Sequence, residues 1–130
     1  MHRTAAALAV TGLLLVTGCS GGSDEKASAT TPPGASVHLA FTLLKPTDVS
    51  IQAGQAVTFV NDNPIGHVMV QGAWKADPGT GLRTEEHDDG VFSLKLDKPG
   101  QQASHTFTEP GTFQFLCTIH KGMNGRVTVT

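Results

Sequence analysis

Hydrophobic and polar residues alternate along most of the chain from residue 37 to residue 130. In the first stretch, Val37 and Leu39 alternate with His38 and Ala40, and later stretches repeat this pattern. A period of two is typical of β-strands that are buried on one face, and no helical period competes with it outside residues 72–90. Seven or eight strands are predicted, over residues 37–43, 49–52, 57–61, 67–70, 91–96, 104–108, 113–117 and 126–130.

Turn-forming residues separate these segments. Examples are Asp62–Pro64, Asp97–Gly100 and Glu109–Gly111. Short strands at this spacing predict an all-β fold, an antiparallel β-sandwich. Residues 72–90 combine Pro78 with four glycines, so a long surface loop is predicted there.

An acidic run, Glu85–Asp89, lies within this predicted loop. Three interpretations remain open: a solvated loop, a docking patch for a basic redox partner, or a second metal site formed with His87. Trp74 either packs beneath the loop or offers an aromatic contact at the surface, and the sequence does not decide between the two.

Length and composition narrow the class of protein. The 130 residues allow one domain and not two, and 38% of them are hydrophobic, which is enough for a core. The formal net charge is −2, and no basic stripe of the kind that binds nucleic acid is present. A single long apolar run excludes a multi-pass membrane protein. No feature of the sequence requires an oligomer, so a monomer is predicted.

The first 18 residues are predicted to be a lipoprotein signal peptide. Residues 5–16 form an apolar run behind Arg3, too short to span a bilayer but suited to a signal peptide. The next residues, 16–19, read Val-Thr-Gly-Cys and resemble the bacterial lipoprotein signal, which implies cleavage before Cys19 and lipid attachment to it. The alternative is an ordinary secretory signal with an accidental cysteine. Either signal exports the protein, and the lipid would anchor it to the extracytoplasmic side of a membrane in the cell envelope.

Residues 19–36 are predicted to be the lipidated cysteine followed by a flexible tether. Residues 20–36 contain no Val, Ile, Leu, Met or aromatic residue. Such a segment buries too little apolar surface to offset its ordering entropy. The folded domain is therefore predicted over residues 37–130.

Cys117 is the only cysteine besides Cys19, so it has no disulfide partner once Cys19 is lipidated. A lone thiol in an exported protein persists when it is buried or when it binds a metal. The sequence from Cys117 reads Cys-Thr-Ile-His-Lys-Gly-Met, and a loop of this length can bring Cys117, His120 and Met123 around one point. With one further imidazole, this set is typical of a blue copper site rather than of zinc or a hard cation. Taken singly, the three residues could be a buried thiol, a surface histidine and a gap-filling methionine.

His67 is the best candidate for the further imidazole. It opens a predicted strand directly after a turn, so it can meet Cys117 across the end of a sandwich. His38 and His105 lie in mid-strand beside inward apolar residues and are predicted to point to solvent, while His87 lies in the acidic run.

Several segments of the domain carry a resemblance to a known family. They are residues 53–61, His67, residues 110–117 and residues 125–129, together with the Cys-x-x-His-x-x-Met spacing. From Val37 onward the sequence resembles the cupredoxins, the small blue copper proteins of the plastocyanin and amicyanin group, and the short ligand loop is typical of amicyanin. One difference is Val68, which follows His67 where many cupredoxins have an asparagine that ties the two ligand loops together.

The resemblance implies a cupredoxin-like Greek-key β-sandwich that binds one copper ion in a type 1 site. Its ligands would be His67, Cys117, His120 and Met123. Cys117 would supply the strong thiolate bond, the histidines would complete a trigonal plane, and Met123 would be the weak axial ligand. The edge of His120 would be the electron port, rimmed by Ile119, Gly122, Pro64 and Ile65.

The predicted function is one-electron transfer with a redox partner protein, and not catalysis. The alternative is an extracytoplasmic copper carrier or storage protein that delivers copper to an envelope oxidase, which the loss of the asparagine at Val68 would favour. An enzyme with Cys117 as nucleophile and His120 as base would also need an orienting group and an oxyanion hole, and the sequence signals neither.

Overall fold

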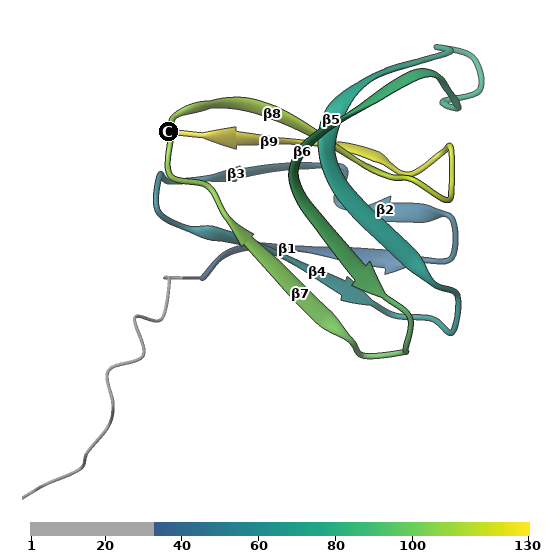
Figure 1. Ribbon diagram of the computed structural model, residues 1–130, viewed down its shortest axis with the longest axis horizontal. Helices are drawn as coiled ribbons and strands as arrows, with labels where there is room; N and C mark the ends of the chain where they lie inside the picture. The colour runs from purple at the N-terminus through teal and green to yellow at the C-terminus, as the bar shows by residue number, and fades with distance from the viewer. Residues whose placement is uncertain (1–32) are drawn as a thin grey trace, which may run out of the picture.

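Nine β-strands in two sheets form a sandwich in the computed structural model, which describes residues 33–130 (Figure 1). The strands are β1 (Pro33–Ala40), β2 (Leu43–Lys45), β3 (Asp48–Ile51), β4 (Ala56–Asn61), β5 (His67–Ala76), β6 (Arg83–Leu96), β7 (Gln102–Thr106), β8 (Gly111–Cys117) and β9 (Asn124–Val129). The predicted all-β sandwich is confirmed. The strand count rises to nine because the segment expected as one strand over residues 37–43 turns at Phe41, whose φ is 52°, and divides into β1 and β2.

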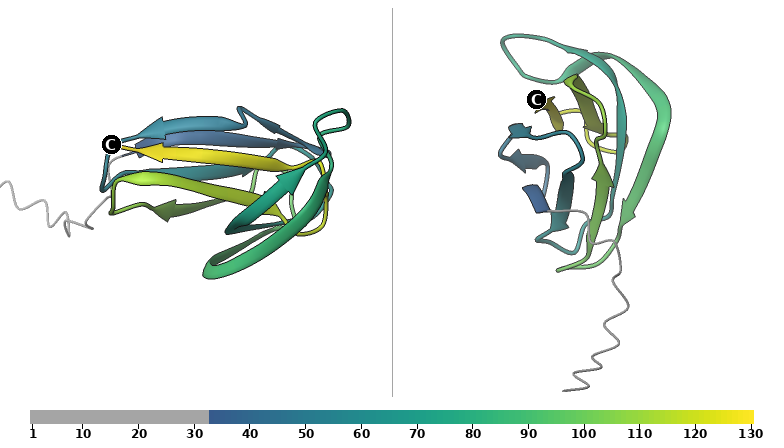
Figure 2. Two further views of the ribbon diagram at one scale, coloured as in Figure 1. Left: turned by 90° about the horizontal axis from the view of Figure 1, so that it is seen from above. Right: turned by 90° about the vertical axis from the view of Figure 1, so that its left-hand side faces the viewer.

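The two sheets have the strand orders β2-β1-β4-β7 and β3-β9-β8-β5-β6, and they lie face to face (Figure 2). Most neighbours are antiparallel as predicted, but β1 pairs with β4 and β3 pairs with β9 in parallel. The parallel pairs arise because the chain changes sheets between the paired strands: β3 lies in the second sheet, between β1 and β4 in sequence. Hydrophobic alternation reports which face a residue occupies and not the direction of its neighbour, so the pattern could not predict these pairs.

The first strand begins four residues before the predicted domain boundary at residue 37. Pro33 pairs with Ala56, and a Cβ at Gly34 would lie 2.5 Å from the Ala56 carbonyl oxygen. The small residues of this segment hid its strand character, because a strand in such close contact carries no hydrophobic alternation. The predicted signal peptide, Cys19 and the tether up to residue 32 lie outside the described residues.

The predicted surface loop over residues 72–90 is instead a β-hairpin, and this expectation was wrong. β5 and β6 remain paired beyond the sandwich, from Gly72 opposite Asp88 to Ala76 opposite Arg83. This extension, the outer hairpin of residues 72–90, projects from one end of the sandwich (Figures 1 and 2). Most of its residues are exposed on both faces, so the period-two signal of a half-buried strand is absent from its sequence.

The core lies between the sheets and ends at the level of the predicted metal ligands. Val37, Leu39 and Phe59 are fully buried on one side, and Phe59 meets Phe115 of the other sheet edge-to-face at a ring distance of 5.2 Å. Cys117 and Met123 belong to the same buried cluster. Within residues 33–130, no helix is long and apolar enough to cross a membrane.

Candidate metal centre

Two strand ends and the loop after one of them position the three residues that offer a nitrogen or thiol ligand. His67 is the first residue of β5, Cys117 is the last residue of β8, and His120 lies in the short connection from β8 to β9. β5 and β8 are neighbours in one sheet, with Met69 opposite Cys117 in the register. The thiol and the first imidazole are therefore brought together by regular strand pairing, 50 residues apart in sequence.

The three ligand atoms converge on one point. The Cys117 Sγ atom lies 3.9 Å from Nδ1 of His67 and 3.6 Å from Nδ1 of His120, and all three ligand atoms lie within 4.8 Å of one another. The two imidazole rings are 5.0 Å apart between centroids. His67 and Cys117 are fully buried and His120 is partly exposed, so the cluster is open to solvent only along the His120 side.

Burial prepares His67 for a metal. Loss of water around the ring lowers its pKa below the usual value, and the nearby His120 lowers it further. A histidine with a lowered pKa is neutral at neutral pH, and neutral imidazole is the form that binds metals.

Met123 closes the ligand loop beside these residues. Its side chain is fully buried. Its N–H donates to the His120 carbonyl over 3.1 Å, and its own carbonyl accepts the N–H of Cys117 over 2.9 Å. These two bonds fold the loop back on the end of β8, so that Cys117, His120 and Met123 share one compact turn.

Two buried asparagines organise the segment before His67, and the sequence predicted no role in the site for either of them. The Asn61 side chain donates to the carbonyls of Ile65 and Leu96, and its oxygen accepts the N–H of Asn63 over 3.0 Å. The Asn63 side chain donates to the Leu39 carbonyl over 2.6 Å, and its nitrogen lies 3.4 Å from Nε2 of His67. A strand end rich in Asn and Asp reads as an ordinary turn, so only burial reveals their role.

Arg83 is the second feature that the sequence did not reveal. It begins the outer half of β6, yet only 3% of its surface is exposed. Its guanidinium group donates to the carbonyls of Cys117, His120 and Met123. An arginine at the edge of an acidic, polar stretch carries no signal of burial in its sequence.

The other histidines lie apart from the centre, and one differs from expectation. His38 is exposed and pairs with Asp62 over 2.8 Å, as a solvent-facing residue should. His105 was expected to point to solvent, but it is half-buried, with its ring 4.5 Å from Phe92 and 4.8 Å from Phe107. Phe92 belongs to β6, and Phe107 directly follows β7 of the other sheet. The alternation within residues 104–108 could not show that these two rings flank His105.

The acidic run lies on the outer hairpin, where several of its carboxylates have partners. Glu85 pairs with Lys75, Glu86 pairs with Arg83, and an Asp88 oxygen accepts the N–H of Gly90. Nε2 of His87 lies 4.0 Å from Asp89. In the described part of the chain, the one group of three or more His, Cys, Asp or Glu ligands is the cluster at Cys117. The second metal site at His87 therefore has no third ligand there.

Trp74 packs back on the sandwich. Its indole N–H donates to the Gly125 carbonyl over 3.2 Å, and the Arg126 guanidinium lies over its ring at 4.6 Å. These contacts settle the choice that the sequence left open, because the ring is half-buried against β9.

An apolar rim surrounds the exposed edge of His120. A groove at this position is lined by the apolar residues Leu43, Leu82 and Ile119 and by His120, together with Thr42, Thr80, Gly81, Lys121 and Gly122. Leu43, Leu82 and Ile119 are all at least half-exposed. Of the four residues predicted for this rim, Ile119 and Gly122 line the groove, whereas Pro64 and Ile65 do not. Leu43 and Leu82 come from segments that the sequence did not connect with the site.

Comparison with known proteins agrees with this geometry. A family model described as copper binding proteins, plastocyanin/azurin family, matches residues 33–130. Chloroplastic plastocyanin from Physcomitrium patens is 37% identical over 87 residues, covering 65% of this chain and 49% of the relative. Plastocyanin from Scenedesmus fuscus is 32% identical over 89 residues, covering 67% and 86%. An amicyanin variant solved in its reduced Cu(I) form at pH 4 is 27% identical, covers 75% of this chain and 82% of its own, and has a TM-score of 0.54.

The chain spans about half the length of the Physcomitrium patens relative and most of the length of the Scenedesmus fuscus relative. A β-sandwich that gathers one thiol and two imidazoles at one end defines a protein that binds a soft or intermediate metal. The family match covers all described residues and shows which class of metal protein this is. The chain belongs to the copper-binding proteins of the plastocyanin/azurin family, the cupredoxins. Its cofactor is copper, and the resemblance seen in the sequence is confirmed.

Proposed function

We propose that the protein is a type 1 copper electron carrier with His67, Cys117, His120 and Met123 as the metal ligands. The observation that carries this proposal is the convergence of the Cys117 Sγ atom and two Nδ1 atoms at distances of 3.6 and 3.9 Å. The donor set fits copper, because a thiolate and a thioether suit Cu(I) while imidazole suits both oxidation states. Copper bound there would alternate between Cu(I) and Cu(II) and so carry one electron.

The surrounding residues hold the ligands in place. His67 and Cys117 are fixed at the ends of paired strands, and buried hydrogen bonds from Asn61 and Asn63 hold the segment before His67. Fast electron transfer requires ligands that move little between the two oxidation states. This bracing therefore supports an electron carrier over the alternative of a carrier that releases copper to an envelope oxidase, for which Val68 remains the one argument.

The exposed edge of His120 is the proposed site of electron exchange. It lies in the groove lined by Leu43, Leu82 and Ile119, and exposed apolar side chains gathered in this way mark a surface where a protein partner can dock. The partner is a redox protein that docks there, and the copper protein acts as a monomer. Export and lipid attachment at Cys19 would place this exchange on the extracytoplasmic side of a membrane.

The proposed site predicts an intense visible colour that depends on sulfur. Purified protein loaded with one equivalent of Cu(II) should show strong blue absorption and narrow copper hyperfine splitting in EPR, because the Cys117 thiolate bonds covalently to copper. The Cys117→Ser variant should lose the colour while keeping the fold, since serine occupies a similar volume. His87→Gln, a change to an exposed histidine on the outer hairpin, is the matched control and should leave the spectrum unchanged.

Two results would contradict the proposal. One is a colourless wild-type protein with the EPR signal of ordinary Cu(II). The other is a blue colour that survives in Cys117→Ser. Ready loss of copper from the loaded wild-type protein to an apo-protein acceptor would favour the copper carrier instead.

A further inference from the structure

Arg83 is buried, unlike the residues that follow it on the outer hairpin. β6 begins at this residue, and the stretch that follows it is exposed through Val91, whereas the Arg83 side chain is 1% exposed. Burying a guanidinium group is costly unless all its donors find partners. The partners of Arg83 therefore show what the burial achieves.

Those partners lie mainly in the ligand loop. One terminal nitrogen, Nη2, donates to the Cys117 carbonyl over 2.7 Å. The other, Nη1, donates to the carbonyls of His120 and Met123 over 3.0 and 3.2 Å and to the Asn124 side chain over 2.6 Å. The three residues whose carbonyls it holds are the proposed copper ligands of this loop.

The remaining contacts join the hairpin backbone to the same loop. The Arg83 N–H donates to the Lys121 carbonyl over 2.9 Å, and Asn124 donates to the carbonyls of Gly81 and Lys121. Nε of Arg83 pairs with the half-exposed Glu86 carboxylate over 2.6 Å, which compensates the buried charge. Hydrogen bonds thus attach the ligand loop to a segment that lies about 35 residues earlier in the chain.

Arginine suits this task better than lysine. Its planar group directs donors along fixed directions, so three carbonyls bonded to one guanidinium are fixed relative to one another. Lysine would carry the same charge as a point on a flexible stem and could not reproduce this pattern. Hydrogen bonds to a charged donor are stronger than those to a neutral donor, and a buried carbonyl left without a partner destabilises the fold.

We propose that Arg83 is a positioning residue for the copper ligands: its buried guanidinium group fixes the backbone of Cys117, His120 and Met123 and so makes the outer hairpin part of the copper site. The copper part of this proposal rests on the function proposed above. The ordering of the loop does not, because the contacts join protein groups to one another.

Amide hydrogen exchange in the metal-free full chain tests the ordering directly. In Arg83→Lys, the amides of Cys117 and Met123 should exchange at least roughly tenfold faster, because one charged hydrogen bond is worth that factor or more. Amides of β1 and β4 should keep their wild-type rates. Glu86→Gln, which keeps the shape but removes the charge that orients Nε, should cause a smaller increase in the same loop amides and provides a second variant if Arg83→Lys does not fold.

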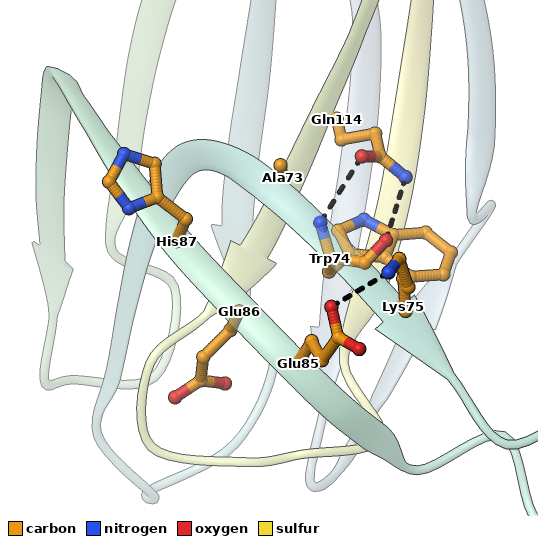
Figure 3. A pocket seen from close by; sticks show the side chains of 7 residues that line it. All are labelled: Ala73, Trp74, Lys75, Glu85, Glu86, His87 and Gln114. Atoms are coloured by element: carbon orange, nitrogen blue, oxygen red, sulfur yellow. Dashed lines mark hydrogen bonds and ion pairs between the residues drawn. The ribbon is translucent and has the colours of Figure 1, made fainter.

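Lys75→Gln is the matched control. Lys75 is a cation on the same hairpin, paired with Glu85 over 2.8 Å, but 72% of its side chain is exposed. Figure 3 shows this pair on the hairpin, with Gln114 bonded to the backbone of Trp74 beside it. Lys75→Gln removes a positive charge from the hairpin, which Arg83→Lys does not, but it leaves the ligand loop untouched, so loop exchange should stay at the wild-type rate.

Copper-loaded protein supplies the second measurement. Arg83→Lys should shift the thiolate-to-copper absorption band and the reduction potential, whereas Lys75→Gln should leave the band in place. Loop exchange at the wild-type rate in both Arg83→Lys and Glu86→Gln would overturn the proposal, and so would an equal acceleration of all amides, which would make Arg83 a general stability residue. A wild-type protein that binds no copper would defeat the proposed function alone, because the exchange result stands without metal.

Discussion

His105 is a half-buried titratable residue away from the metal centre. Its ring packs between Phe92 and Phe107, and burial lowers its pKa from the usual 6.5. The folded protein therefore binds this proton less readily than the unfolded chain. The sign follows from this difference: the contribution of His105 to stability is present above pH 6.5 and is lost as the pH falls through the lowered pKa.

We predict that His105→Phe flattens the loss of stability at acidic pH. Phenylalanine keeps an aromatic ring at this position but has no proton to bind. The free energy of unfolding of the metal-free protein, measured in urea between about pH 7.5 and pH 5, should fall less steeply in the variant than in the wild type. Part of the slope should remain, because the pKa of His67 is lowered as well. Parallel curves for the two proteins would show that His105 carries none of the dependence.

The residues of the candidate site differ in how far they can be predicted from the sequence. Cys117, His120 and Met123 lie within seven consecutive residues, so spacing and donor chemistry selected them as candidate ligands, whereas His67 was selected by its place at the start of a strand and by the family resemblance. Three of their ligand atoms converge as predicted. Arg83 could not be selected, because the groups it holds in the ligand loop are backbone carbonyls, which leave no trace in the identity of any residue.

Among the elements, the outer hairpin differs most from what its sequence predicts. Exposure on both faces removes the alternation that marks a strand, and four glycines in residues 72–90 suggested a loop. Gly72 has a different role. It lies where the register of β5 and β6 shifts, and a Cβ there would lie 2.0 Å from the His87 carbonyl oxygen. The close approach of the two backbones at this point lets the hairpin continue beyond the sandwich.

Gly72→Ala should therefore move the base of the hairpin. The contact is with backbone atoms and cannot be relieved by a side-chain rotation, so we expect a loss of about 1–3 kcal/mol in the free energy of unfolding. Urea unfolding of the metal-free protein measures this loss. Gly79→Ala is the control, because a Cβ there meets only the Asp77 side chain, at 3.3 Å, near the exposed tip. Equal stability of Gly72→Ala and Gly79→Ala would show that the hairpin base yields without cost.

On the scale of the whole molecule, the metal centre and the described chain ends lie at opposite ends of the sandwich (Figure 1). Pro33 pairs with Ala56 at the start of β4, whereas Asn61, at the other end of β4, belongs to the segment that leads to His67. A strand of this length spans about 17 Å. Thr130 lies at the same end as Pro33, bonded to Ile51 and Ala53.

This polarity bears on the lipid anchor proposed at Cys19. The chain enters the fold at the end that is remote from His120, so an anchor before residue 33 leaves the apolar rim of Leu43, Leu82 and Ile119 free for a partner. We predict that copper-loaded protein in membrane vesicles is oxidised by ferricyanide at the same rate as protein solubilised in detergent, followed by the visible absorption. A rate that is low on vesicles and recovers in detergent would mean that the membrane covers the His120 edge. The proposed orientation of the site away from the membrane would then be wrong, even with copper and its ligands in place.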